Sequence, residues 1–135
     1  GIQPKAALLS HSNFGSSDQP SAIKMRETLA LVKQKAPWLE VDGEMHGDVA
    51  LDGDVREAQM PDSSLIGDAN LLVLPNLDSA NIAYNLLKTA AGGNIAIGPV
   101  LLGAAKPVHI LTASTTVRRI VNMTALTVAD ASAVR

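Results

Sequence analysis

Few residues in this sequence have the types and spacing that catalysis needs. His11 stands between Ser10 and Ser12, but adjacent residues rarely present their side chains to one another as a catalytic pair. The Gly-x-Ser-x-Gly motif of a nucleophilic serine is absent, as are the Gly-x-Gly-x-x-Gly fingerprint of dinucleotide binding and the Gly-Lys-Ser/Thr phosphate loop. Motifs alone therefore give little support to nucleophilic or nucleotide-dependent catalysis.

Metal binding and acid–base catalysis are also weakly supported. Three histidines lie far apart in the sequence, without a His-x-x-x-His pair: His11, His46 and His109. Asp42, Glu44 and Asp48 are clustered, and two interpretations stay open for them. They are either acid–base or cation-binding groups, or carboxylates that cap helices and stabilise turns. We predict no metal site in this segment.

Composition excludes several classes of protein. The chain has 135 residues, of which 47% are hydrophobic, and a formal net charge of −2, so it can form a core and is not disordered. Its 11 basic and 13 acidic residues, with only three aromatic residues, argue against nucleic-acid binding. The absence of cysteine excludes disulfides and thiol catalysis and fits a cytoplasmic protein. No apolar run approaches the roughly 20 residues of a membrane helix, so no membrane association is expected.

The elements that must position any site are predicted from hydrophobic periodicity. Apolar runs predict buried strands at 6–9, 70–74, 95–97 and 108–111, and a strand at 39–42 that Gly43 ends. Helices are expected over Ala22–Ala36 with Ser21 as N-cap, near Asp48–Ala58, after a cap at Asp78 or Ser79, and from Thr115 or Thr116. Strands that alternate with helices predict an α/β fold, with a mostly parallel sheet in three α/β/α layers.

Ligands of such sheets bind at the carboxyl ends of the strands, which here carry hydroxyl, amide and backbone N–H donors suited to phosphate or a polar acyl group. The candidate ligand-binding residues are Ser10, Ser12, Asn13, Asn76, Gly98, Pro99, Thr112, Ser114 and Thr115. Each also has a structural interpretation. The first three and the last three would cap helices, Asn76 would bond to nearby backbone, and Gly98-Pro99 would form a turn.

Several segments, taken in order, carry a family resemblance. They are 8–16 (LLSHSNFGS), 41–45 (VDGEM) with 48–51 (DVAL), 64–70 (SLIGDAN), 74–84 (LPNLDSANIAY), 97–103 (IGPVLLG) and 107–111 (PVHIL). This order resembles the C-terminal part of the phosphate acetyl/butyryltransferases and covers nearly the whole chain. The forms Ser-His-Ser-Asn-Phe-Gly, Asp-Gly-Glu-Met and Val-Asn-Met-Thr-Ala-Leu are more similar to one subgroup, the phosphotransacetylase-like domain at the C-terminus of bacterial NADP-dependent malic enzymes.

One departure from the family pattern bears on activity. Active transferases carry Ser-Arg-Gly after the strand that follows Pro-Val, with an Asp several residues later, and these groups are implied to hold the acyl phosphate and activate the coenzyme A thiol. Here the triplet reads Thr112-Ala113-Ser114, and the Asp aligns with Arg119. A neutral Ala113 cannot stabilise the charge of a transferring acyl phosphate, an effect worth several kcal/mol of barrier. We therefore predict a non-catalytic domain in which these positions are degenerate.

The resemblance implies a phosphotransacetylase fold, related to isocitrate and isopropylmalate dehydrogenases, of which this chain is the C-terminal part. Residues 1–105 would form most of one α/β subdomain, and residues 106–135 would return to the other. The implied function is acetyl-CoA binding that inhibits a malic enzyme, with no cofactor in this segment. The parent enzyme would convert malate to pyruvate with NADP and a divalent metal (Mg or Mn) in N-terminal domains of the same chain.

The resemblance also implies self-association as a dimer or higher oligomer. Two alternatives stay open: an active phosphate acetyl/butyryltransferase that draws its arginine from the absent half of the fold, and a purely structural assembly domain.

Overall fold

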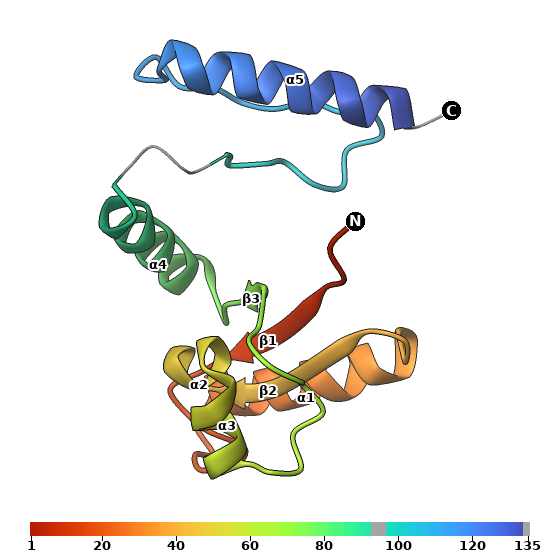
Figure 1. Cartoon of the computed structure of the whole chain (residues 1–135), viewed down its shortest axis with the longest axis vertical. Helices are drawn as coiled ribbons and strands as arrows, with labels where there is room; N and C mark the ends of the chain where they lie inside the picture. Colours follow the sequence, from red (N-terminus) through yellow and green to blue (C-terminus); the bar gives the residue numbers. More distant parts are fainter. Residues whose placement is uncertain (93–96, 134–135) are drawn as a thin grey trace. The chain divides into compact units, whose positions relative to one another are not determined.

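The structure is a computed structural model that describes residues 1–92 and 97–133, drawn in Figure 1. The chain divides into two compact units, Gly1–Asn85 and Leu86–Arg135. Among the described residues, no helix is both long and apolar enough to cross a membrane. The domain boundary predicted near residue 105 refers to the complete family fold and stays a prediction.

The first unit is built on a parallel sheet of three strands among the described residues. β1 (Lys5–Leu9) lies in the middle, between β2 (Glu40–Met45) and β3 (Leu71–Val73), so the strand order is β2-β1-β3. Ala6 is the shared register point, paired with Val41 on one side and with Leu71 on the other. Because all strands run in the same direction, their carboxyl ends lie at one edge of the sheet.

Helices cover both faces of this sheet, which confirms the predicted α/β class (Figure 1). On one face, α1 (Pro20–Lys35) packs Met25 against Ala6 and Leu8. On the other face, α2 (Gly47–Leu51) packs with α3 (Gly53–Gln59) on a cluster that contains Ala7. The alternation of Ala6 and Ala7 between the two clusters is the two-residue period of a strand buried on both faces.

The prediction that Gly43 ends the second strand is wrong, because β2 continues to Met45. Gly43 has φ +143°, and a Cβ there would lie 2.5 Å from the Leu8 carbonyl oxygen. The register of β1 against β2 shifts between Leu8 and Leu9, at the same place. Glycine here lets the two backbones approach closely, so it shapes the strand rather than terminating it.

The single helix predicted near Asp48–Ala58 is two helices, α2 and α3, separated at Asp52. The Asp52 side chain accepts hydrogen bonds from the backbone N–H groups of Asp54 and Val55, both at 3.1 Å, and so caps α3. Arg56 of α3 is 2% exposed and donates to the carbonyls of Val49 at 2.9 Å and Leu65 at 3.2 Å, and also to those of Ala50 and Gly67. This buried guanidinium joins α2, α3 and the segment that leads to β3.

Two helix starts differ from the prediction. α1 is preceded by Gln19 rather than capped by Ser21, because Pro20 occupies the first helical position, where its fixed φ and missing N–H are tolerated. α4 (Leu77–Ala90) begins before Asp78. Its cap is Asn76, whose Oδ1 accepts from the Ser79 backbone N–H at 2.9 Å and from the Ser79 hydroxyl at 2.6 Å.

The later strands are also weaker than predicted. β3 is three residues long, and its Leu71 and Val73 are partly exposed at the edge of the sheet, while Leu72 packs on the core. The strand predicted at 95–97 falls mostly outside the described residues. The strand predicted at 108–111 is wrong: this segment is irregular, and within the described part of the second unit no strand lies beside it to accept its backbone bonds.

The second unit contains α5 (Val117–Ala133), which begins directly after Thr116, close to the start that was predicted at Thr115 or Thr116. Thr116 precedes it, and its hydroxyl accepts from the Arg119 backbone N–H at 3.3 Å. Most apolar side chains of α5 are exposed, among them Val117, Val121 and Val128, and Met123 is the buried residue of this helix.

Candidate ligand-binding site

The candidate site lies at the carboxyl ends of β1 and β2. The chain leaves β1 through residues 10–17, which we call the serine loop. Two backbone hydrogen bonds hold this loop against the end of β2, from the Ser10 N–H to the Met45 carbonyl at 2.9 Å and from the Phe14 N–H to the Glu44 carbonyl at 2.7 Å. The parallel pairing of β1 and β2 therefore places the loop directly beside Glu44.

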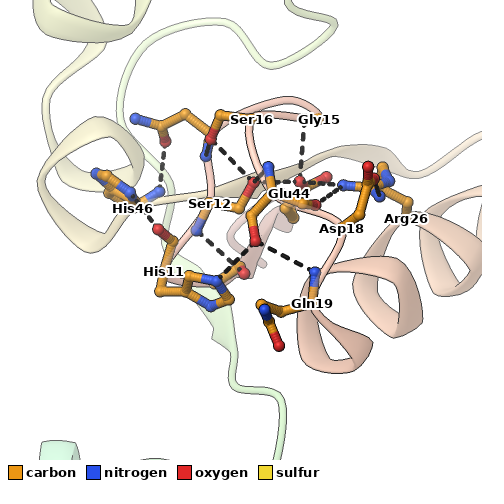
Figure 2. A network of polar contacts seen from close by, with 12 residues as sticks. His11, Ser12, Gly15, Ser16, Asp18, Gln19, Arg26, Glu44 and His46 are labelled. Carbon is orange, nitrogen blue, oxygen red and sulfur yellow. Dashed lines mark hydrogen bonds and ion pairs between the residues drawn. The ribbon is translucent and has the colours of Figure 1, made fainter.

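The centre of the site is the buried carboxylate of Glu44, which is 0% exposed. Figure 2 shows polar groups converging on it. Its Oε1 accepts hydrogen bonds from the Ser12 hydroxyl at 2.7 Å, from the Gly15 backbone N–H at 3.0 Å and from Arg26 Nη1 at 2.8 Å. A carboxylate in a core needs such donors, because burying a charge without partners is costly.

Ser12 and Arg26 each extend this network. The Ser12 hydroxyl also bonds the Ser16 hydroxyl at 3.0 Å and accepts from the Ser17 N–H at 3.0 Å. Arg26, on α1, also donates to the Ser17 carbonyl at 2.8 Å and to Asp18 Oδ1 at 3.0 Å. The network thus joins β2, the serine loop and α1.

These contacts set the ionisation of Glu44. Burial raises the pKa of its carboxyl, because it removes water from the charged form. Hydrogen bonds from Ser12, Gly15 and Arg26 act in the opposite direction and prevail, so the pKa of Glu44 lies below its ordinary value of 4.5. Glu44 is therefore ionised at neutral pH and has a structural role in this fold.

Of the other two clustered carboxylates, Asp42 is held by hydrogen bonds within the fold and Asp48 is exposed. Asp42 accepts from the Gly43 N–H at 2.9 Å, from the Ser63 hydroxyl at 2.8 Å and from the Ser64 N–H at 2.7 Å. Asp48 is exposed in the first turn of α2. Across residues 1–92 and 97–133, no three His, Asp or Glu side chains gather in a group that could hold a metal ion.

Asn13 and the two nearby histidines fasten the outer side of the loop. Asn13 Oδ1 accepts from the His46 N–H at 2.7 Å, and its Nδ2 donates to Gln59 at 3.0 Å. His46 Nε2 lies 2.8 Å from the His11 carbonyl oxygen, and His11 Nε2 lies 3.1 Å from the Ser17 hydroxyl. Asn13 thus connects the loop to His46, the residue before α2, and to α3.

The predicted ligand residues fall into separate groups. Ser10, Ser12 and Asn13 share the serine loop, where Ser12 is buried and the Ser10 hydroxyl accepts from the Ser12 N–H at 3.2 Å. None of the three caps α1. Asn76 caps α4, which is the local bonding that the sequence also suggested. Ligand contact by these residues stays a prediction.

The remaining candidates belong to the second unit. The Thr112 hydroxyl bonds Ser114 at 3.1 Å and Thr115 at 3.3 Å, and the Thr112 N–H donates to the Thr115 hydroxyl at 3.1 Å, so this hydroxyl loop is closed on itself. Gly98 is buried with φ +118° and is joined to Pro99 by a cis peptide bond. These positions form a turn and a loop, and their ligand contacts also stay predictions.

Sequence reasoning missed Arg26. Its only sequence signal is its place directly after Met25, at the border of the apolar stripe of α1. Glu44 is among the clustered carboxylates noted in the sequence. The convergence of Ser12, Gly15 and Arg26 on one of its oxygens depends on the irregular pairing of β1 with β2, which the sequence pattern does not predict.

Fold and site together define an α/β domain with a polar loop at the carboxyl ends of parallel strands. Comparison with known proteins agrees with this class. Residues 1–128 match the profile of the family described as Phosphate acetyl/butaryl transferase. This chain therefore belongs to the phosphate acetyl/butyryltransferase family, and the resemblance seen in its sequence is confirmed.

Curated relatives include malic enzymes and transferases. An NADP-dependent malic enzyme of Escherichia coli (strain K12) is 60% identical over 97% of this chain, which spans 17% of that protein. An NAD-dependent malic enzyme of Rhizobium meliloti is 58% identical over 98% of the chain and is likewise covered to 17%. A phosphate acetyltransferase of Paracoccus denitrificans is 47% identical over 93% of the chain and is covered to 39%. The chain thus spans less than half of each relative.

Solved structures confirm the phosphotransacetylase fold. A phosphotransacetylase from Streptococcus pyogenes matches with a TM-score of 0.89 and 36% identity over 98% of this chain and 40% of its own. A phosphotransacetylase from Staphylococcus aureus matches with a TM-score of 0.86 and 37% identity over 96% of this chain and 40% of its own. The similarity to malic enzymes is higher in identity than that to the transferases.

Proposed function

We propose that this chain is a non-catalytic regulatory segment of a larger NADP-dependent malic enzyme and that it binds acetyl-CoA as an allosteric effector. The observation that carries the proposal is the 60% identity to a malic enzyme over 97% of the chain, against 47% to a phosphate acetyltransferase. The parent enzyme would convert malate and NADP to pyruvate, carbon dioxide and NADPH in N-terminal domains that hold the nucleotide and a divalent metal.

The hydroxyl loop supports the absence of transferase activity. Ala113 lies where active relatives are implied to carry arginine, and an apolar methyl group cannot neutralise the charge of an acyl phosphate. Arg119 lies on α5 where a carboxylate base is implied, and a guanidinium cannot accept a thiol proton. Thr112 supplies a hydroxyl, but its oxygen bonds Ser114 and Thr115.

Two loops, each taken by itself, offer polar groups for the effector: the serine loop in the first unit and the hydroxyl loop, with Thr112, Ser114 and Thr115, in the second. Acetyl-CoA presents phosphates, amides and a thioester carbonyl, all of which accept hydrogen bonds from hydroxyl, amide and backbone N–H donors. Inhibition would follow if acetyl-CoA bound one global state of the parent enzyme more tightly than another. Coupling between two sites is typically worth about 1–3 kcal/mol, or roughly 5–150-fold in affinity.

An NAD-dependent malic enzyme is 58% identical to this chain, nearly as similar as the NADP-dependent relative, so identity in this segment does not distinguish the two nucleotides. We propose NADP as the nucleotide of the parent enzyme. We also propose a cytoplasmic homo-oligomer, in agreement with the many exposed apolar side chains of α4 and α5, which include Leu86 and Val121.

Calorimetric titration of acetyl-CoA into the full-length protein tests the proposal, with coenzyme A and acetyl phosphate as control ligands. We expect saturable binding of acetyl-CoA together with inhibition of malate oxidation over the same concentration range. Absence of binding by folded protein would overturn the effector role and favour a structural assembly domain.

The active-transferase alternative has its own support in the 47% identity to a phosphate acetyltransferase. It is tested by phosphate-dependent release of coenzyme A from acetyl-CoA. We expect no activity above background, and turnover at a rate typical of enzymes would overturn the non-catalytic assignment.

A further inference from the structure

The Glu44 network has the form of an occupied anion site. Three donors from two elements, the Ser12 hydroxyl, the Gly15 N–H and the Arg26 guanidinium, converge within 2.7–3.0 Å of one carboxylate oxygen. Proteins hold phosphates and other anions with the same combination of hydroxyl, backbone N–H and guanidinium groups. Here the anion is a side chain of the protein itself, and Figure 2 shows the loop wrapped around it.

We propose that Glu44, Ser12 and Arg26 are positioning residues that hold the serine loop in its ligand-binding form, while contact with the effector falls to the outer side of the loop. This inference rests on the proposed binding of acetyl-CoA. It changes the role predicted for Ser12, from direct ligand contact to support of the residues that make it.

The backbone N–H groups of the serine loop and the side chains around Glu44 already have hydrogen-bond partners within the protein. Each backbone N–H from residue 12 to residue 17 donates within the loop or to Glu44. Ser12 is 0% exposed, and Arg26 is already shared among Glu44, Asp18 and the Ser17 carbonyl. A phosphate of the ligand would have to displace Glu44 to take these groups, so they are unsuited to direct contact.

A single oxygen of Glu44, Oε1, accepts all three of these hydrogen bonds. Glu44 Oε2 is buried without a hydrogen-bond partner among the described residues, so its charge is stabilised through Oε1 alone. Loss of any donor therefore leaves a buried charge with poor compensation, and the loop that supplies two of the three donors would change conformation.

Part of the outer side of the serine loop is accessible to solvent. His11, Gly15 and Ser16 are exposed, and they lie one, three and four positions from the buried Ser12 in the same loop. Their geometry is set by the turn at Phe14 and Gly15, which have φ +46° and +88°. The Gly15 N–H bond to Glu44 fixes this turn, so the charge of Glu44 and the shape of the outer surface are linked.

The test compares Glu44→Gln with a matched control, Asp42→Asn. Both residues are buried on β2, and both accept three hydrogen bonds, but those of Asp42 that cross the chain come from Ser63 and Ser64 instead of the serine loop. Acetyl-CoA affinity is measured by calorimetry on the full-length protein, and thermal unfolding shows that each variant is folded. Amide hydrogen exchange reports the loop directly.

We expect Glu44→Gln to weaken acetyl-CoA binding about tenfold or more, as loss of a charge-assisted hydrogen bond does, and Asp42→Asn to leave it within about twofold. Exchange at Gly15 and Ser17 should accelerate in Glu44→Gln only. Arg26→Lys should retain more affinity than Arg26→Met, because it keeps the charge. If Glu44→Gln does not fold, Ser12→Ala takes its place.

The outcomes separate the two proposals. If the wild-type protein binds acetyl-CoA and Glu44→Gln binds it equally well, or if Asp42→Asn loses as much affinity, the positioning role is overturned and the effector proposal stands. If the folded wild-type protein does not bind acetyl-CoA, the effector proposal and the inference both fall.

Discussion

Replacement of Gly43 by alanine should destabilise the first unit strongly. Gly43 has φ +143°, a conformation that L side chains rarely adopt, and holding a non-glycine residue there costs about 1–3 kcal/mol. The new Cβ would also lie 2.5 Å from the Leu8 carbonyl oxygen and 2.9 Å from the Leu8 Cβ. Such overpacking typically costs about 1–3 kcal/mol.

Leu8 cannot move aside easily, because it lies in the central strand and pairs with both β2 and β3. The two costs therefore add, to about 2–6 kcal/mol. Since small domains are stable by about 5–15 kcal/mol, the variant should lose a large part of its stability.

The assay is urea unfolding monitored by circular dichroism, with Gly47→Ala as the control. Gly47 lies in α2, and a Cβ there would meet nothing within 4 Å, so alanine should be neutral or stabilising by about 0.4–1 kcal/mol. If Gly43→Ala lost less than about 1 kcal/mol, the close approach of β2 to β1 would not be the reason for glycine at this position.

Three further perturbations test other parts of the fold. Because the pKa of Glu44 is lowered, ionised Glu44 should contribute in full to the free energy of unfolding above its ordinary pKa of 4.5. This contribution should be lost as the pH falls through the lower native pKa. Urea unfolding at a series of pH values should show the loss in the wild-type protein and should not show it in Glu44→Gln. Asn76→Ala should lose about 1 kcal/mol by removing the cap of α4, and Asn76→Asp should retain it, as measured by thermal unfolding; equal losses would contradict the capping role. Arg56→Leu leaves the carbonyls of Val49 and Leu65 without the Arg56 donor, so denaturation should show a loss in the free energy of unfolding of about 1–3 kcal/mol for each carbonyl. The control Glu57→Gln, at an exposed neighbouring position, should change this free energy by less than about 0.5 kcal/mol.

Local patterning predicted the elements whose buried residues recur with a regular period. The apolar stripe of α1 and the buried strand at Ala6–Leu9 are visible because burial on a helix face or in a central strand sets the periodicity. Residues 108–111 have the same apolar character without forming a strand, because a strand also needs a pairing partner that local sequence does not specify.

The site was predictable in place but not in detail. Polar residues after β1 pointed to the carboxyl edge of the sheet, where the serine loop does lie. The buried role of Ser12 was not visible, because it depends on Glu44 and Arg26, which are 32 and 14 positions further along the chain. Hydrogen-bond partners at such separations follow from strand register and helix orientation, and neither is encoded by spacing alone.

The position of β1 in the middle of the sheet also constrains how the first unit is assembled during synthesis. Ala6 pairs with Val41 on one side and with Leu71 on the other. One edge of β1 therefore stays unpaired until the chain has been extended 30 residues beyond Val41. A nascent chain that ends between these points exposes an unpaired apolar strand edge, which other chains can join. We therefore expect fragments that end between β2 and β3 to aggregate, and fragments that extend past β3 to be more soluble.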